Sequence, residues 1–255
     1  MESWEGSVQH CNMHEQLWFT AILNHLFAVP VTALLRAFHI NPTYPDAPIY
    51  NSFAMEVLVF LFLVSFFAAV RMRLSVDRPG ALQHVFEGMN GFIQGQSEEI
   101  IGHHSEGFTP FLVTLMVFIL ISNLIGLIPG FESPTATPVV PLGCAVCAFL
   151  YYNVQGFKRH GIAYPKQFLG PIWWLSPLML PLEIISHLAR LLSLTIRLYA
   201  NIFAGDMVTL VFFSLVPIGV PIIFLGLHIF VSMLQTYIFV LLTTVYLAGA
   251  VAEEH

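Results

Sequence analysis

Residues 191–206, LLSLTIRLYANIFAGD, place an arginine, an asparagine and an aspartate within an otherwise mostly apolar run. This run belongs to a longer apolar segment, residues 172–216, which extends well beyond the roughly 20 residues that a helix needs to cross a bilayer. A charged side chain at the centre of a membrane helix costs about 2.5–3.5 kcal/mol on insertion scales, so it usually faces a partner or a water-filled cavity. The segment therefore predicts a membrane helix in which Arg197 has a specific task.

The composition of the whole chain is that of an integral membrane protein. Of its 255 residues, 57% are hydrophobic and only 9% are charged, and the mean hydropathy is +0.78. Such a chain has too few polar side chains to cover a water-soluble globule. The net charge of −6 and the absence of a basic stripe argue against a nucleic-acid partner. The acidic start, MESWEGSVQH, predicts no cleaved secretory signal.

Five apolar segments are long enough to span about 30 Å of hydrocarbon as helices. They cover residues 53–70, 110–128, 138–157, 172–216 and 217–252. The last two exceed the minimum length, which predicts strong tilt, a kink or a hairpin of two long helices lying obliquely in the membrane. Four prolines predict helix breaks in this region: Pro177, Pro181, Pro217 and Pro221. We therefore expect an all-α integral membrane protein with about five membrane helices.

Two further segments, residues 17–40 and 83–101, are amphipathic and are predicted to lie at the membrane interface. Pro30 is expected to interrupt the first of them. The stretch NPTYPDAPIYNS, residues 41–52, is rich in proline and turn residues and predicts a linker. We therefore divide the chain into an N-terminal outer or interfacial segment with its linker, residues 1–52, and a membrane domain, residues 53–255.

Basic residues predict the orientation of the chain, because short loops rich in Lys and Arg remain on the cytoplasmic side. They gather after the first and the third span: Arg71, Arg73, Arg78, Lys158, Arg159 and Lys166. Both loops are therefore expected in the cytoplasm. Counting spans then places the N-terminus outside and the C-terminus inside.

The polar residues of segment 172–216 form one stripe when the segment is wound at 100° per residue. Within a sector of about 120° lie Glu183, His187, Arg190, Ser193, Arg197 and Asn201. Asp206 falls about 180° from Arg197, unless Gly205 breaks the helix, so the two side chains are expected to face opposite ways. In the following segment His228, Ser232 and Gln235 share a face.

Neither acid of the same predicted helix is well placed to form an ion pair with Arg197. An ion pair with Glu183 would have to bridge about 21 Å of helix, and an ion pair with Asp206 is disfavoured by the opposite facing. Snorkelling to the lipid headgroups suits Arg190 better, since it lies nearer the predicted cytoplasmic end. The favoured interpretation is a carboxylate on another chain, buried in the membrane.

A buried carboxylate facing Arg197 would be poised between two protonation states. Burial in lipid favours the protonated acid, whereas a guanidinium about 4 Å away favours the ionised form by about 4 kcal/mol at an effective dielectric constant near 20. The two effects are comparable, so approach to Arg197 can decide whether the acid holds its proton. Arginine itself stays charged, which lysine need not do.

Such a device also needs a proton route from each side of the membrane. Asp206 and His228 are candidates for an outer half-channel, and Glu183 and His187 for an inner one. For each of these residues the alternative is a polar group satisfied by a neighbouring helix.

Three motifs and the C-terminus carry a family resemblance. They are LSLTIRLYANIFAGD around Arg197, LHIFVSMLQTYIFVLLTTVYLAGA around His228 and Gln235, TPFLVTLMVFILISNLIGLIPG at residues 109–130, and the ending AEEH. With them the sequence resembles subunit a of the F-type ATP synthase membrane sector. The topology of that family agrees with the orientation derived from the basic residues.

The resemblance implies a stator that presents two offset half-channels to a ring of c subunits, with Arg197 at the essential carboxylate of the ring. It implies an outer pathway formed by Asn201, Asp206, His228 and Gln235, with Ser193 and Glu183 beside the inner one. Asp206 stands where the family commonly has Glu. Gly126 stands where some relatives have an acid, so no carboxylate is expected in that outer loop, and Asn123 is a further candidate for lining the entry.

The resemblance also implies the partners and the location of the chain. The partners are the c-ring of small hairpin subunits, peripheral-stalk b subunits and the lipid bilayer. Of the two locations open to the chain, a bacterial cytoplasmic membrane is favoured over the membrane of an organelle. The chain is expected to be a non-catalytic subunit with no cofactor and no metal, and it contains no P-loop. The alternative is a self-contained ion channel or secondary transporter, although the inverted repeats that many such transporters show are not visible here.

Overall fold

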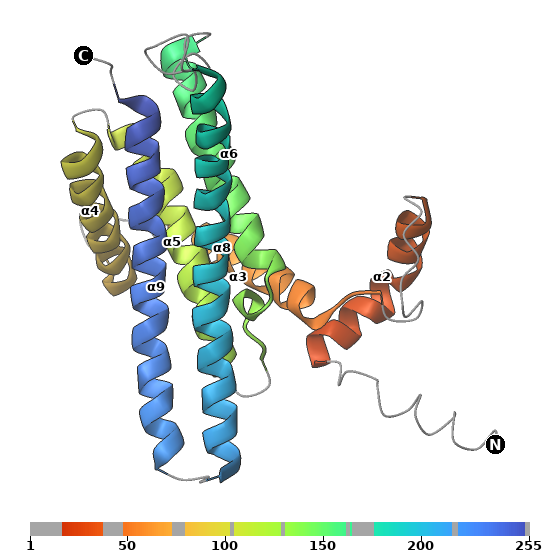
Figure 1. Ribbon diagram of the computed structural model, residues 1–255. Coiled ribbons are helices and arrows are strands. Elements are labelled where there is room, and N and C mark those ends of the chain that lie inside the picture. The colour runs from red at the N-terminus through yellow and green to blue at the C-terminus, as the bar shows by residue number, and fades with distance from the viewer. Residues whose placement is uncertain are drawn as a thin grey trace.

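The computed structural model describes residues 17–37, 48–72, 80–102, 105–128, 131–161, 164, 176–215 and 219–252. Within these ranges the chain forms helices and connecting turns, without strands (Figure 1). The predicted all-α architecture is therefore confirmed. The linker residues 41–47, the break expected at Pro217 and the last three residues lie outside the described ranges.

The described helices match the predicted segments closely. They are α2 (Trp18–Ala37), α3 (Asn51–Met72), α4 (Ala81–Ile101), α5 (Thr109–Leu124), α6 (Val139–His160), α8 (Ser176–Leu215) and α9 (Val220–Val251), with 3-10 turns η1 (Ser105–Gly107), η2 (Ile125–Leu127) and η3 (Pro134–Ala136). Five of them, α3, α5 with η2, α6, α8 and α9, are long and apolar enough to cross a membrane. The five predicted spans are thus confirmed as helices, while the division at residue 52 stays a prediction.

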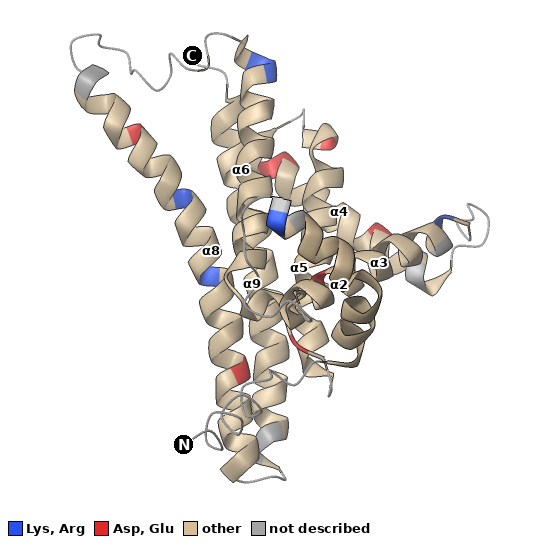
Figure 2. Ribbon diagram, turned by 90° about the vertical axis from the view of Figure 1, so that its right-hand side faces the viewer, with Lys and Arg blue, Asp and Glu red and all other residues tan. Residues whose placement is uncertain are grey.

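The two longest helices, α8 with 40 residues and α9 with 32, run side by side as an antiparallel hairpin (Figure 1). At about 1.5 Å per residue both are much longer than about 30 Å of hydrocarbon. Figure 2 shows the N-terminal part of α8 diverging from the other helices. The long hairpin is therefore present, and its tilt in the bilayer stays a prediction.

Two of the prolines in the hairpin lie where helices tolerate them. Pro177 and Pro221 occupy the first turns of α8 and α9, where a backbone N–H has no helical acceptor. The predicted break at Pro181 is wrong, because α8 continues through it. Pro181 lies near the N-terminal end, so the single hydrogen bond that it removes leaves most of the helix intact.

The predicted interruption of the first amphipathic segment at Pro30 is also wrong, because α2 is continuous from Trp18 to Ala37. Proline removes one backbone donor and crowds the preceding turn. Next to it, the Thr32 hydroxyl donates to the carbonyls of Ala28 and Val29 at 2.8 and 2.9 Å. This side-chain bonding adds hydrogen bonds in the turn that proline disturbs.

The largest apolar core lies where α5, α6, α8 and α9 meet. Its buried residues are Leu115, Ile119, Cys144, Ala145, Ala148, Leu194, Leu198, Ile202 and Phe239. Small residues of α6 allow the helices to approach closely, as is common in membrane bundles. By contrast, only 11% of the apolar part of α8 is buried within the structure. Most of this helix is therefore available to lipid or to another subunit.

The two amphipathic helices pack at the edges of the bundle. α4 lies along α5 and α9 (Figure 1), where Tyr237 donates to Oε1 of Gln96 at 3.3 Å. α2 is fastened to the start of α3, because the amide of Asn24 bonds both the N–H and the carbonyl of Ile49. Their position relative to a bilayer stays a prediction.

Candidate functional site

Polar side chains of the long hairpin gather at three levels, named here after one residue each. The Asp206 cluster contains Asp206 of α8, three groups of residues from α5, α9 and the η3 region, and no others: Ser122 and Asn123 of α5, His228, Ser232 and Thr236 of α9, and Ser133 and Thr135 of the η3 region. The Arg197 cluster contains Arg197, Ser193, Asn201 and Gln235. The His187 cluster contains His187, Glu183 and Tyr152. Acidic and basic residues are spread along the length of α8 (Figure 2).

The Asp206 cluster begins with a pair that joins α8 to α9. Nε2 of His228 lies 3.7 Å from Oδ1 of Asp206, and the side chains are 3% and 34% exposed. Gly205 makes this approach possible, because a Cβ at that position would lie 2.6 Å from Nδ1 of His228. The helix is not broken at Gly205, so Asp206 indeed faces away from Arg197.

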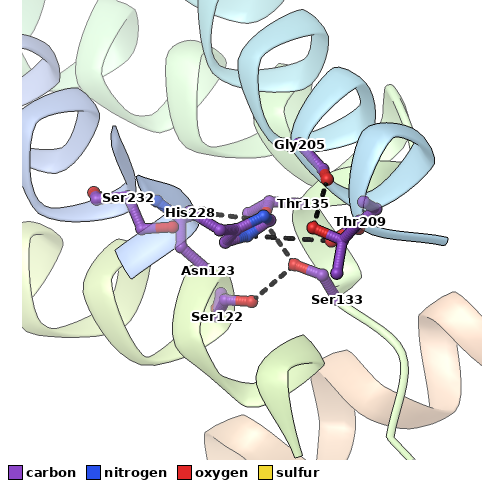
Figure 3. A network of polar contacts seen from close by, with 9 residues as sticks. Ser122, Asn123, Ser133, Thr135, Gly205, Thr209, His228 and Ser232 are labelled. Atoms are coloured by element: carbon purple, nitrogen blue, oxygen red, sulfur yellow. Dashed lines mark hydrogen bonds and ion pairs between the residues drawn. The ribbon is translucent and has the colours of Figure 1, made fainter. Parts of the chain in front are cut away.

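Asn123 of α5 is the hub of a buried network beside this pair (Figure 3). Its Oδ1 accepts a hydrogen bond from Thr135 at 2.7 Å. Its Nδ2 donates to Oγ1 of Thr236 at 3.3 Å and to the carbonyl of Ser232 at 3.5 Å. Asn123 is fully buried and links the η3 region to α9.

The loop before η3 is fastened by a second contact. Ser133 donates to the carbonyl of Ser122 at 2.9 Å and lies 3.0 Å from Oγ1 of Thr135 (Figure 3). Glycine is required at position 126, where the chain packs against Ser133, because a Cβ added to Gly126 would lie 2.8 Å from Cβ of Ser133. A polar stretch that the sequence predicts as an outer loop is thus partly buried among α3, α5, α6 and α8.

Several buried polar atoms in this region have no hydrogen-bond partner within the described chain: Oγ of Ser122, Nε2 of His228, Oγ of Ser232 and Nε2 of Gln235. For His228 only the longer contact with Asp206 is present. Buried polar groups in folded proteins are nearly always hydrogen-bonded, and ordered water is a frequent partner. The helix packing where α9 meets α5 and α8 therefore leaves several buried polar atoms without a partner among the described residues.

Glu132 supplies a carboxylate in the loop after Gly126. It is exposed, directly precedes the buried Ser133, and interacts electrostatically with Asp206. The closeness of Glu132 to Asp206 could not be predicted, because the two residues belong to segments that only the folded chain brings together.

Arg197 has only a neutral partner in the part of the chain that the structure describes. Its Nη2 donates to Oγ of Ser193, one turn away on α8, at 3.4 Å. No carboxylate of the described residues forms an ion pair with it. Nearby, Asn201 donates to Oε1 of the buried Gln235 at 2.6 Å, which joins the two long helices.

The His187 cluster lies between α6 and α8. Nε2 of His187 is 3.4 Å from Oε1 of Glu183, and its Nδ1 is 3.0 Å from the hydroxyl of Tyr152. Close by, the guanidinium of Arg190 lies 5.3 Å above the ring of Tyr246 of α9, so the structure places this charge against an aromatic face.

Most candidate residues from the sequence meet as pairs. Asp206 meets His228, Asn201 meets Gln235, Arg197 meets Ser193, and Glu183 meets His187. Four contributors were not anticipated: Glu132, Thr135, Tyr152 and Thr236. Among the described residues no group of three or more His, Cys, Asp or Glu is placed to hold a metal ion.

These features define a multi-span all-α membrane protein whose polar side chains concentrate where its two longest helices meet each other and their neighbours. The family model of the ATP synthase A chain matches residues 52–248. The match covers α5, α6 and α8 and all but the outer ends of α3 and α9, and the chain therefore belongs to the ATP synthase A chain family.

Similar proteins agree with this assignment. The ATP synthase subunit a of Koribacter versatilis is 61% identical over 244 residues, which cover 95% of this chain and 100% of the relative. The ATP synthase subunit a of Solibacter usitatus is 54% identical over 213 residues, or 83% of this chain and 91% of the relative. ATP synthase subunit a 3 of Pelobacter propionicus is 39% identical over 230 residues, or 90% and 98%.

Proposed function

We propose that this chain is the proton-translocating stator subunit of a rotary F-type ATP synthase. It forms two half-channels against a c-ring and is held by peripheral-stalk b subunits, and it catalyses no reaction on its own. It works in a bacterial cytoplasmic membrane, with the N-terminus outside and the C-terminus in the cytoplasm. Membership of the ATP synthase A chain family and the five membrane helices support this proposal.

The observation that carries the proposal is the charge of Arg197. It lies far from either end of α8, and only a neutral hydroxyl bonds it within the described chain. A guanidinium in a membrane needs a counter-charge or water. A carboxylate on a passing ring subunit supplies that counter-charge. Because arginine does not release its proton, it favours deprotonation of each arriving acid and prevents protons from passing directly between the half-channels.

The outer half-channel runs through the Asp206 cluster. Asp206 and His228 exchange protons with the outside, while Asn123, Asn201 and Gln235 hold the pathway in shape. The buried polar atoms without a protein partner support this assignment, because a purely structural helix contact would leave few such atoms unsatisfied. A proton that moves down the membrane potential through this half-channel releases about 2.3 kcal/mol of free energy for each 100 mV that it crosses.

The inner half-channel runs along Ser193, His187 and Glu183 towards the cytoplasm. These residues lie on the same stripe of α8 as Arg197 and are separated from it by one to four turns. The offset between this stripe and Asp206 supports two routes that do not connect within the chain.

A self-contained ion channel or transporter is the competing function. Such a protein would have to meet the charge of Arg197 itself, and no carboxylate of the described residues does so. The ring-dependent function is therefore favoured.

The test is Arg197→Ala in the assembled ATP synthase. We expect loss of at least about 99% of proton-driven ATP synthesis in membrane vesicles, since an electrostatic contribution near 4 kcal/mol corresponds to more than a hundredfold. Normal amounts of the subunit in the purified complex would show that assembly is spared. Arg190→Gln, which removes the same charge two turns away, should retain measurable synthesis. Proton-driven synthesis by assembled Arg197→Ala complexes would refute the proposal.

A further inference from the structure

Tyr152 continues the His187 cluster into the protein interior. Its hydroxyl lies 3.0 Å from Nδ1 of His187, whose Nε2 lies 3.4 Å from Glu183. The exposed fraction falls along this row, from 41% for the Glu183 side chain to 12% for the His187 side chain and 2% for Tyr152. A phenol, an imidazole and a carboxylate thus form a continuous polar chain from the accessible side of α8 to the buried side of α6.

The chemistry of the three groups selects one tautomer of His187. A neutral imidazole has one donor and one acceptor nitrogen, and an ionised carboxylate only accepts. Glu183 therefore requires the proton on Nε2, which leaves Nδ1 as an acceptor for the phenol O–H of Tyr152. The opposite tautomer would direct a lone pair of Nε2 at the carboxylate. The phenol and the carboxylate therefore stabilise the same arrangement.

The position of the Tyr152 hydroxyl is fixed by packing. The ring of Tyr152 stacks at 6.0 Å from the ring of His187 and meets Phe149 edge to face at 5.3 Å. Tyr246 of α9 packs against it at 6.2 Å. Enclosed on three sides, the hydroxyl has little freedom to leave Nδ1 of His187.

We propose that Tyr152 is a positioning residue of the inner half-channel, which holds His187 as the Nε2–H tautomer so that the imidazole donates to Glu183. This inference rests on the proposed function of the chain. In this arrangement Tyr152 carries no proton across the membrane. It determines how His187 and Glu183 share protons, and therefore the pH at which the inner half-channel works.

Among the described residues, the charged and titratable groups around His187 come from three helices and from Tyr164. Glu183 and Arg190 belong to α8, Tyr152 to α6 and Tyr246 to α9, and Tyr164 lies close enough to influence Tyr152. Arg190 lies over the ring of Tyr246 and keeps a permanent positive charge near the cluster. All of these groups remain when only the hydroxyl of Tyr152 is removed.

The experiment uses the complete ATP synthase in inside-out membrane vesicles, where the external medium sets the pH on the cytoplasmic side. ATP-driven proton pumping, divided by ATP hydrolysis in the same vesicles, is measured against external pH. We expect Tyr152→Phe to shift the pH of half-maximal pumping by about half to one unit, because one neutral hydrogen bond and one pH unit correspond to similar free energies. Tyr151→Phe is the matched control, since Tyr151 stacks on Phe111 instead, at 3.8 Å.

A second set of complexes, in which His187 is already replaced, distinguishes an effect of Tyr152 on His187 from a general effect of Tyr152 on helix packing. If Tyr152 acts through His187, Tyr152→Phe should cause no further shift in complexes that already carry His187→Asn, or His187→Gln if the first variant does not assemble. An unchanged pH profile in Tyr152→Phe, or an equal shift in both backgrounds, would overturn the inference. These outcomes leave the proposed function intact, because that function fails only if Arg197→Ala complexes still make ATP from a proton gradient.

Discussion

Gly205 shows how the lack of a side chain can organise a site. It directly precedes Asp206, and the imidazole of His228 occupies the space where its Cβ would lie. The sequence alone indicated Gly205 only as a possible helix break. The actual reason for glycine, the close approach of α9, depends on which helix packs there, and no periodicity within α8 reveals it.

We therefore predict that Gly205→Ala impairs the outer half-channel without breaking the helix. The added Cβ would lie 2.6 Å from Nδ1 of His228, so the imidazole must move relative to Asp206. Such overpacking costs about 1–3 kcal/mol, while alanine itself favours a helix by about 0.5–1 kcal/mol. Proton-driven ATP synthesis in vesicles should fall several-fold at normal subunit content.

Gly143→Ala on α6 is the control for this prediction. A Cβ at Gly143 meets no atom within 4 Å, so ATP synthesis should stay near the level of the unmodified protein. If Gly205→Ala complexes synthesise ATP equally well, close packing of Gly205 on His228 does not matter for the pathway.

At the scale of whole elements, the sequence predicted which helices form better than it predicted how they pack against one another. The predicted spans and the observed helices differ by only a few residues at their ends, because long apolar runs have few alternatives to a helix in lipid. The predicted helix breaks at Pro30 and Pro181 are wrong, because a helix can continue past one lost hydrogen bond. The η3 region was missed as a buried element, since its polar residues find their partners far away in sequence.

The η3 region leads to a prediction on stability. Thr135→Val keeps the shape of the side chain but removes the donor to Oδ1 of Asn123, an acceptor that is fully buried. An unsatisfied buried acceptor costs about 1–3 kcal/mol. We expect the solubilised complex to lose this subunit at a temperature several degrees lower, as measured by thermal dissociation followed on native gels.

Thr137→Val provides the comparison, because the Thr137 hydroxyl bonds only the carbonyl of Pro134 in the same turn. Its effect should be clearly smaller. Equal thermal behaviour of both variants would mean that the link from the η3 region to α5 contributes nothing to holding the subunit together.

At the scale of the whole molecule, the arrangement of helices leaves most of α8 uncovered, including its apolar side, which lies about 130° round the helix from Arg197. Five large apolar side chains there recur at helical spacing and are exposed: Ile185, Leu188, Leu192, Ile196 and Phe203. The sequence predicted this helix and its polar stripe, but an apolar side chain in a membrane helix looks the same whether it faces lipid, the bundle or another subunit. Only the packing of α6 and α9 on the other side of α8 shows which residues remain uncovered.

This uncovered side predicts where the ring makes contact. In a chain with its native cysteines replaced, a cysteine in place of the exposed Ile196 should form a disulfide with a cysteine on the outer helix of a ring subunit, at the level of its essential acid. Val154→Cys on α6 is the matched control, since Val154 is similarly exposed but lies on another helix. Because Ile196 is exposed and directly precedes Arg197 at the same level of α8, a rotor that meets Arg197 should also reach Ile196, so oxidation should give the cross-linked band only for the Ile196 variant. Equal cross-linking from both positions, or none from Ile196 in fully assembled complexes, would show that the rotor lies elsewhere and that the charge of Arg197 is met by something other than a ring carboxylate.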